Sequence, residues 1–265
     1  MEIDFSLAVS VKYENFKTCD QSGFCKRNRA YADAAAQVGT TWESPYRIDS
    51  SSVDFKDGHF RATVIKTVIS GGDQVQLPLD VTFLVSGTAR VIVDEERRRE
   101  GEIELRHDSK ARKERYDGAG EWALIGGLEL DNAARLADKQ QEGYTIIVYG
   151  KKQELQANIR HKPFNIDFKR NGRTEIKLND RNLMEYEHWR PKAEKGQADG
   201  SAETVLSADE DTWWEETFGG NTDSKPRGPE SVGLDITFPG YEHVFGIPEH
   251  AGPLSLRETR WVFHW

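Results

Sequence analysis

The stretch "YTIIVYGKKQELQANIRHKPFNIDFKR", residues 144–170, predicts three consecutive β-strands. In its second and third segments apolar residues alternate with polar ones, as at Leu155, Ala157 and Ile159. A period of two places such residues on one face of a sheet. The breaks "GKKQ" and "HKP" are of turn length. The stretch therefore indicates an antiparallel meander with one buried face.

Further strand patterns lie on both sides of this meander, within residues 59–70, 74–96, 182–189 and 231–239. One short helix is expected over residues 130–143, with Asp131 or Asn132 near its N-cap and Gly143 at its end. No alternation of strands with helices is apparent. Many short strands joined by Gly- and Asn-rich turns are typical of an all-β, antiparallel β-sandwich.

Charge and hydropathy argue against two classes of partner. The chain has 265 residues and a net charge of -9, which disfavours a nucleic-acid partner. Its apolar runs fall short of the about 18 residues of a membrane span, so no membrane partner is expected. Residues 5–11 form a short apolar run after an acidic start. This run is either an ordinary strand or the remnant of a secretory signal.

A polar, acidic segment interrupts the strand pattern after residue 190. Residues 193–211 are rich in Gly, Ser, Asp and Glu, and we expect a flexible surface loop there. The adjacent Trp213 and Trp214 are expected to anchor its far end by packing. Stacking on a sugar ring is the alternative role for this pair.

Cys19 and Cys25 are the only cysteines of the chain, with five residues between them. A structural zinc site needs four ligands, and neither a C-x-x-C motif nor a second cysteine pair is present. A thioredoxin-like redox pair would also need C-x-x-C. A disulfide that closes a tight loop fits the spacing best, because Ser22 and Gly23 permit the turn. Two reduced thiols remain open on spacing alone.

Three longer blocks resemble a known family. They are "NFKTCDQSGFCKRNR" (residues 15–29), "SKPRGPESVGLDITFPG" (residues 224–240) and "HVFGIPEHA" (residues 243–251). They are similar to the N-terminal region of glycoside hydrolase family 31 enzymes of the glucosidase II α-subunit type. The resemblance extends over residues 15–259. It implies a galactose-mutarotase-like β-sandwich of the kind that precedes a (β/α)8 barrel.

The resemblance also implies a domain order and a compartment. We expect an N-terminal arm with a disulfide loop, a β-sandwich that contains the acidic loop, and an atypical tail, at residues 1–30, 31–259 and 260–265 respectively. Family members work in the lumen of the endoplasmic reticulum, an oxidising compartment. The resemblance therefore favours the Cys19–Cys25 disulfide over free thiols.

No catalytic residue can be assigned in this chain. Retaining glycosidases use two carboxyl groups about 5–5.5 Å apart, and the family carries both on its barrel. Its nucleophile lies in a Trp-x-Asp-Met-Asn-Glu segment, which none of the seven tryptophans begins. Asp235 lies in an alternating strand and is expected to face solvent, while Glu242 and Glu249 flank a turn. We expect no hydrolysis by this chain alone, and no cofactor or metal.

One loop is the candidate sugar contact. In the family the sandwich reaches over the barrel rim beside the active site, and "FGIPEHAG" (residues 245–252) matches that segment. Gly246 would shape the turn, and Glu249 and His250 would present polar groups to substrate. Bracing of the sandwich against the barrel is the alternative role. Gly252 stands where members resembling the animal enzyme have aspartate, which weakens the transfer.

The tail "RWVFHW" (residues 260–265) departs from the family, which continues there with a glycine-rich stretch. A truncated gene model or an alternative transcript would explain it. The sequence thus predicts the N-terminal sandwich of an α-glucosidase that trims glucose from N-glycans. The implied partners are the glucosidase II β-subunit and glucosylated N-glycans. A stand-alone carbohydrate-binding or regulatory sandwich is the alternative.

Overall fold

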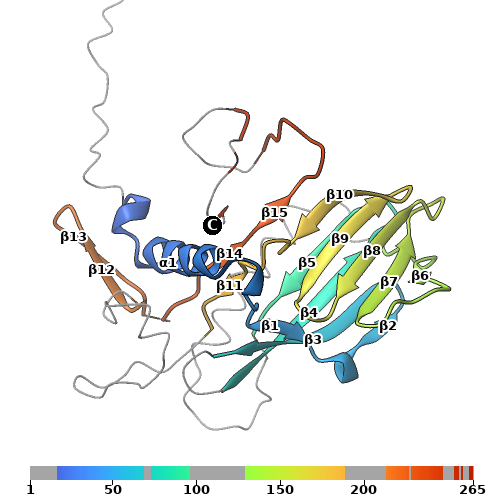
Figure 1. Ribbon diagram of the computed structural model, residues 1–265, viewed down its shortest axis with the longest axis horizontal. Helices are drawn as coiled ribbons and strands as arrows, with labels where there is room; N and C mark the ends of the chain where they lie inside the picture. Colours follow the sequence, from blue (N-terminus) through green and yellow to red (C-terminus); the bar gives the residue numbers. More distant parts are fainter. Residues whose placement is uncertain are drawn as a thin grey trace, which may run out of the picture.

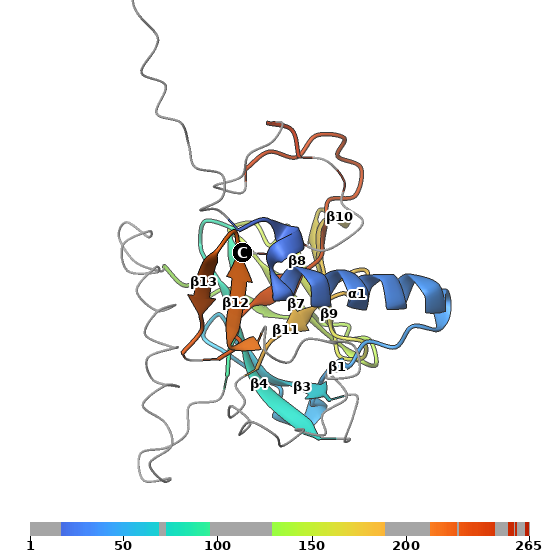
Figure 2. The ribbon, with the colours of Figure 1, turned by 90° about the vertical axis from the view of Figure 1, so that its left-hand side faces the viewer.

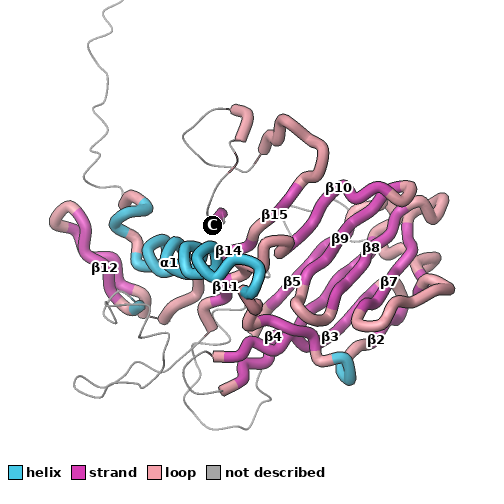
Figure 3. Tube along the Cα trace, in the orientation of Figure 1, coloured by secondary structure: helices cyan, strands magenta, loops and turns pink. Residues whose placement is uncertain are grey.

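The structure of the chain, a computed structural model, is built mainly from antiparallel sheets (Figures 1 and 3). It describes residues 17–68, 73–95, 129–188, 213–226, 228–246, 254–256, 258 and 263–264. The expected run at residues 5–11, the acidic loop at 193–211 and most of the tail lie outside this described part.

The first sheet has five strands, in the order β1-β3-β4-β5, with β2 paired to β3. Their bounds are β1 (Tyr46–Ile48), β2 (Asp54–Lys56), β3 (His59–Thr67), β4 (Gln74–Phe83) and β5 (Ala89–Val93). The long β3–β4 pair forms its centre, where Phe60 pairs with Val81 and Val64 with Leu77. Strands predicted within residues 59–70 and 74–96 are therefore confirmed.

The second sheet has six strands in the order β15-β10-β9-β8-β7-β6. Their bounds are β6 (Arg135–Leu136), β7 (Tyr144–Tyr149), β8 (Leu155–Arg160), β9 (Asn165–Arg170), β10 (Arg173–Leu178) and β15 (Ile236–Thr237). Strands β7, β8 and β9 are the predicted meander, and Leu155, Ala157 and Ile159 are all buried. The period of two thus assigned the inner face correctly.

The core lies between the two sheets. Phe60 and Leu77 of the first sheet and Ile147 and Ile166 of the second are each 0% exposed and belong to one cluster. Burial of a large apolar side chain contributes about 1.5–3 kcal/mol each. This shared core makes the two sheets a sandwich, as predicted.

Helix α1 (Gly23–Val38) is the one α-helix of the described residues, and the sequence analysis missed it. Its alanine-rich second half favours helix. Tyr31, Ala32 and Ala35 are buried in a second cluster with Leu183. The helix ends at Gly39, which has a φ of 66° and donates its N–H to Ala35 O. It runs across residue 30, the expected end of the arm.

Short 3-10 turns lie at η2 (Cys19–Gln21), η3 (Gly39–Thr41) and η4 (Ser50–Ser52).

The helix predicted over residues 130–143 is wrong. The segment folds as turns and the short strand β6. The Asp131 carboxylate accepts hydrogen bonds from Ala133 N at 3.0 Å and from Gly150 N at 2.7 Å. The second bond ties the segment to the end of β7. Since that partner is 19 residues away in sequence, a local helical pattern could not reveal it.

Two small sheets lie beside α1 (Figure 1). One contains β11 (Glu185–Tyr186), β14 (Val232–Leu234) and β16 (Phe263–His264), and the other is the hairpin of β12 (Glu215–Phe218) and β13 (Asn221–Ser224). Figure 2 shows the hairpin beside the N-terminal end of α1. The strands predicted within residues 182–189 and 231–239 are short but present. None of the helices in the described part of the chain has the length and apolar character of a membrane crossing.

Candidate functional site

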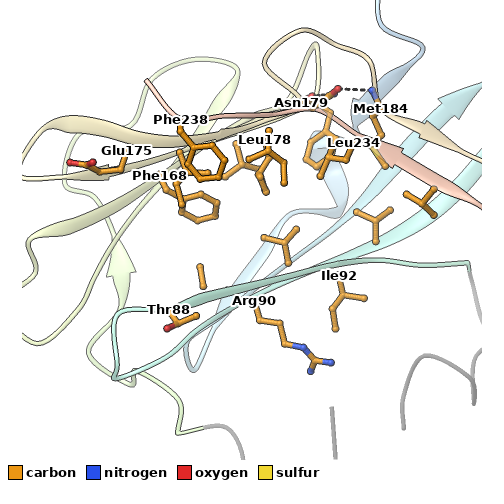
Figure 4. Close-up of a pocket in the computed structure, with 18 of the residues that line it drawn as sticks. Thr88, Arg90, Ile92, Phe168, Glu175, Leu178, Asn179, Met184, Leu234 and Phe238 are labelled. Carbon is orange, nitrogen blue, oxygen red and sulfur yellow. Dashed lines mark hydrogen bonds between the residues drawn. The ribbon is translucent and has the colours of Figure 1, made fainter. Parts of the chain in front are cut away.

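An apolar groove opens at one edge of the sandwich. It has a volume of about 790 Å3 and lies between edge strand β5 and the residues of β9, β10, β14 and β15. Figure 4 shows Phe168, Leu178 and Phe238 on one wall and strand β5 on the other. Volumes of about 300–1,000 Å3 are typical of sites that bind ligands or side chains. The groove therefore has the size of a ligand or side-chain binding site.

The groove exists because both sheets end on the same side without closing. Among the described strands, β5 pairs only with β4, and β15 pairs only with β10. Strand β15 has just two residues, Ile236 and Thr237, so it covers little of the wall. The half-buried Leu178 and Leu234 pack on the core below it and remain open to the groove.

Asp235 holds the wall of the groove in place. The chain passes at this residue from β14 in one sheet to β15 in another. The Asp235 carboxylate accepts hydrogen bonds from Arg181 N at 2.8 Å and Leu183 N at 3.0 Å. Burial raises the pKa of Asp235, and the two backbone hydrogen bonds oppose that shift. The residue is 4% exposed, so the expectation that it faces solvent is wrong, because it fixes a crossing between sheets.

Asn179 forms the buried end of the same wall. Its Nδ2 donates to Phe164 O at 2.6 Å. Its Oδ1 accepts from Met184 N at 2.8 Å, as Figure 4 shows. The backbone has a φ of 58°, in the left-handed region that asparagine tolerates. The side chain is fully buried, so both polar groups depend on these partners.

A loop beside the groove carries the first of the predicted sugar contacts. Tyr241 donates its hydroxyl to the Glu175 carboxylate, and a hollow of about 370 Å3 lies between them and Phe245. Phe245 is 60% exposed. Gly246 follows with a φ of 114°, a conformation that other residues rarely adopt. No atom lies within 4 Å of a Cβ built there, so backbone conformation and not crowding requires glycine.

Two of the predicted sugar contacts cannot be placed. Glu249 and His250 lie outside the described residues, so their roles stay predictions. Glu242 is exposed on the loop. The described part of the chain holds no group of three His, Cys, Asp or Glu side chains placed to bind a metal ion.

The cysteines form the disulfide that the sequence favoured. Cys19 and Cys25 are bonded, with a Cα–Cα distance of 5.5 Å. Cys25 lies on the buried face of α1, so the bridge ties the preceding turn to the helix. Just inside the loop, Gly23 donates its N–H to Glu216 Oε1 at 3.0 Å. The disulfide thus belongs to the junction between the N-terminal segment and the β12–β13 hairpin.

Glu216 is the buried charge of this junction. Its side chain is 1% exposed and pairs with Lys17 at 2.5 Å and Lys225 at 2.7 Å. Burial alone would raise the pKa of Glu216, but the hydrogen bonds from the two lysines and from Gly23 N outweigh it and lower that pKa. A charged carboxylate is therefore built into the fold here.

Another buried ion pair joins α1 to Glu187, the residue that follows β11. Arg27 Nη2 lies 2.6 Å from Glu187 Oε1, whose side chain is 2% exposed. The Arg27 guanidinium also lies 4.1 Å from the centre of the Trp213 ring. Trp213 is 7% exposed, which confirms its predicted packing role. Its neighbour Trp214 lies against Gly228, where a Cβ would approach the ring to 2.8 Å.

Comparison with known proteins identifies the family. Residues 78–264 match the model of the glycosyl hydrolase 31 N-terminal galactose mutarotase-like domain. The chain belongs to this family. The match begins in β4 and ends in β16, so it includes both walls of the groove.

Relatives extend the match to the N-terminal segment. The glucosidase 2 subunit alpha of Schizosaccharomyces pombe is 32% identical over 245 residues, which are 92% of this chain and 25% of that protein. The neutral alpha-glucosidase AB of Mus musculus is 31% identical over 274 residues, 96% of this chain and 26% of that protein. The chain thus spans about a quarter of the length of these relatives.

Solved structures agree in fold. A glucosidase II alpha subunit in a DNJ-bound form is 56% identical, with a TM-score of 0.78, and the match covers 94% of this chain and 25% of that one. An ER glucosidase II heterodimer of the catalytic subunit and the binding domain of the regulatory subunit matches with a TM-score of 0.77, at 56% identity, over 92% of this chain and 25% of that one. The resemblance stated from sequence motifs is therefore confirmed.

Sequence reasoning missed the groove and the buried ion pairs of Glu216 and Glu187. The run "ARVIV" at β5 was recognised as a strand, but its place at a sheet edge depends on which strands pair with it. Arg27 and Glu187 are 160 residues apart in sequence. Nothing in the local pattern around either residue indicates that they meet.

Proposed function

We propose that this chain is the N-terminal sandwich of an α-glucosidase of the endoplasmic reticulum that trims glucose from N-glycans. The observation that carries the proposal is the 56% identity to glucosidase II alpha subunits over 94% of this chain. In this role the chain supplies structure to a catalytic part that lies elsewhere in the enzyme. The lumen of the endoplasmic reticulum and its oxidising conditions suit the Cys19–Cys25 disulfide.

The proposed partners follow from the same relatives. The heterodimeric structure pairs a catalytic subunit with the binding domain of a regulatory subunit. We propose a β-subunit as the protein partner and glucosylated N-glycans as the substrate of the complete enzyme.

Gly246, Glu249 and His250 are the proposed substrate-side loop. The exposed Phe245 and the hollow beside Tyr241 support this assignment, because sugar sites combine ring contacts with polar groups. Gly246→Ala would distort the loop at a φ of 114°, and Gly172→Ala is its matched control, with a φ of 81° and equally open space. In the extended enzyme described next, we expect Gly246→Ala to raise KM for glucosylated oligosaccharide and Gly172→Ala to leave it unchanged. Equal KM values would remove the loop from the substrate site.

The experiment for the main proposal compares two proteins. One is this chain, and the other is this chain extended with the downstream three quarters of a glucosidase II alpha subunit. We expect the extended protein to release glucose from glucosylated mannose oligosaccharides and the 265-residue chain to release none. Failure of a folded extended protein to trim would overturn the proposal. Calorimetric titration of the short chain with the same oligosaccharides tests the stand-alone binding alternative, which a flat titration would exclude.

A further inference from the structure

We propose that the apolar groove receives a β-strand from the downstream part of the same enzyme, added to the free edge of β5. The inference rests on the proposed function, since it needs the polypeptide that the relatives carry beyond this region. It assigns to the groove a partner of defined chemistry: an extended segment with apolar side chains on the face that meets the core.

Within the described part of the chain, no strand pairs with the backbone of β5 on the groove side. Asp94 N donates to Pro78 O at 3.0 Å, and Leu84 N donates to Thr88 O at 2.9 Å. Bonds to β4 therefore use Thr88, Asp94 and the alternate residues between them. It follows that the N–H and C=O groups of Ala89, Val91 and Val93 point away from β4. Among the described strands no other pairs with β5, so these groups present an open edge.

The side chains of the same three residues face the core. Ala89, Val91 and Val93 are partly buried and pack on the main cluster. Figure 4 shows Arg90 and Ile92 directed to the other side of β5, away from Phe168 and Leu178. An added strand would therefore continue this alternation and place every second side chain in the groove.

The opposite wall fits apolar side chains. Phe168, Leu178, Leu234 and Phe238 line the groove, and the first three also touch the core cluster. Water in such a groove gains few hydrogen bonds, whereas an apolar side chain contributes roughly 25 cal/mol per Å2 of buried surface. Edge pairing with side chains in pockets is the recognised mode of strand addition.

Two observations favour a downstream segment as the occupant. The chain spans 25% of the glucosidase II alpha subunit structures, so those proteins hold ample polypeptide to fill the groove. In addition, β16 (Phe263–His264) pairs with β14, and β14 residues Val232 and Leu234 line the groove. A polypeptide that continues beyond β16 therefore starts next to a strand that lines the groove.

Hydrogen exchange tests the inference directly. The amides of Ala89, Val91 and Val93 are measured by mass spectrometry in this chain and in the extended chain described above. Val91→Pro is then introduced to remove the outward N–H while keeping the bonds to β4. Leu136→Pro is the matched control at β6, the far edge of the second sheet, where Ala137 N bonds to Ile146 O and the Leu136 N–H points outward. Phe238→Glu, outside the strands, places a charge on the apolar wall opposite β5 and leaves the sequence of β5 unchanged.

We expect the three amides to exchange at least about tenfold more slowly in the extended chain. Val91→Pro and Phe238→Glu should each abolish most of this protection at the remaining β5 amides, and Leu136→Pro should leave it intact. Circular dichroism of each variant in the short chain reports whether the sandwich itself folds.

Three results would overturn the inference. They are unchanged exchange of the β5 amides in an extended chain that trims glucose, equal loss of protection in Leu136→Pro, or protection that appears in the short chain only as its concentration rises. The last result would assign the edge to a second copy. Glucose release without slower exchange of the β5 amides would support the proposed function and contradict the strand addition. Slower exchange without glucose release would support the strand addition and contradict the proposed function.

Discussion

Asn179→Ala provides the sharpest test of how the groove wall is held. The substitution removes the acceptor of Met184 N and the donor to Phe164 O, both in a fully buried site. Each buried polar group left without a partner costs about 1–3 kcal/mol. The substitution also places alanine in the left-handed region, at a φ of 58°, without the polar side chain that helps asparagine adopt it. This backbone conformation costs alanine about 1–2 kcal/mol.

Asn171 is the matched control. It has a φ of 49°, lies in the exposed β9–β10 turn, and its N–H donates to Glu154 O through the backbone. Asn171→Ala therefore meets the same backbone cost without a buried hydrogen bond. We expect Asn179→Ala to exceed Asn171→Ala by about 2–6 kcal/mol in the free energy of unfolding.

Urea denaturation followed by circular dichroism measures both values, and the melting temperature checks them at about 2–4 °C per kcal/mol. Asn179→Gly and Asn171→Gly separate the two causes, because glycine relieves the backbone cost at both positions. We expect glycine to be tolerated at residue 171 and to remain costly at residue 179. Losses within about 1 kcal/mol of each other for the two alanine variants would refute the hydrogen-bond reasoning.

The remaining predictions concern the junction around α1. Arg27→Ala should destabilise the chain by about 3 kcal/mol in denaturation experiments, because it removes the ion-pair partner of the buried Glu187 carboxylate. Arg29→Ala should cost less than about 1 kcal/mol, because its partner Asp20 is 82% exposed. Similar losses for the two variants would contradict this reasoning. Glu216→Gln should lower the free energy of unfolding at pH 7, because the pKa of Glu216 is lowered in the fold and its ionised form stabilises the fold. This deficit should shrink as pH falls through and below the ordinary carboxyl pKa of about 4.3. A deficit that does not change with pH would argue against a role of the charge. Cys19→Ser with Cys25→Ser should cost about 2 kcal/mol for so short a loop, and mass spectrometry of the unreduced protein should find no thiol open to alkylation, whereas two alkylated thiols would rule out the bridge.

The sequence predicted those parts of the fold that repeat a local rule. The alternation at Leu155, Ala157 and Ile159 named the inner face of β8 before any partner strand was known, and the structure buries all three. The same rule failed at Asp235, which alternates with apolar neighbours and yet is 4% exposed. Its carboxylate accepts hydrogen bonds from the backbone N–H groups of Arg181 and Leu183, which lie more than 50 residues earlier in the chain.

Helical signals were misjudged in both directions. Residues 130–143 have a plausible cap and end but lie in turns and β6, because the Asp131 carboxylate bonds to Gly150 N. The alanine-rich residues of α1 favour a helix, but the segment was interpreted only through its two cysteines. Tyr31, Ala32 and Ala35 confirm it by packing on Leu183. Local propensity decides little until the partner of each face is known.

By itself the sequence determined the all-β class, the family through its long motifs, and the pairing of Cys19 with Cys25. These features depend on residue order over short distances or on a resemblance that order alone carries. Only the tertiary structure decided that β5 and β15 end as open edges around an apolar groove, and that Arg27 meets Glu187 across 160 residues. The physical reason is that hydrogen-bond ladders and buried ion pairs are completed by partners distant in sequence, and an unfilled edge becomes visible only when all described strands have taken their places.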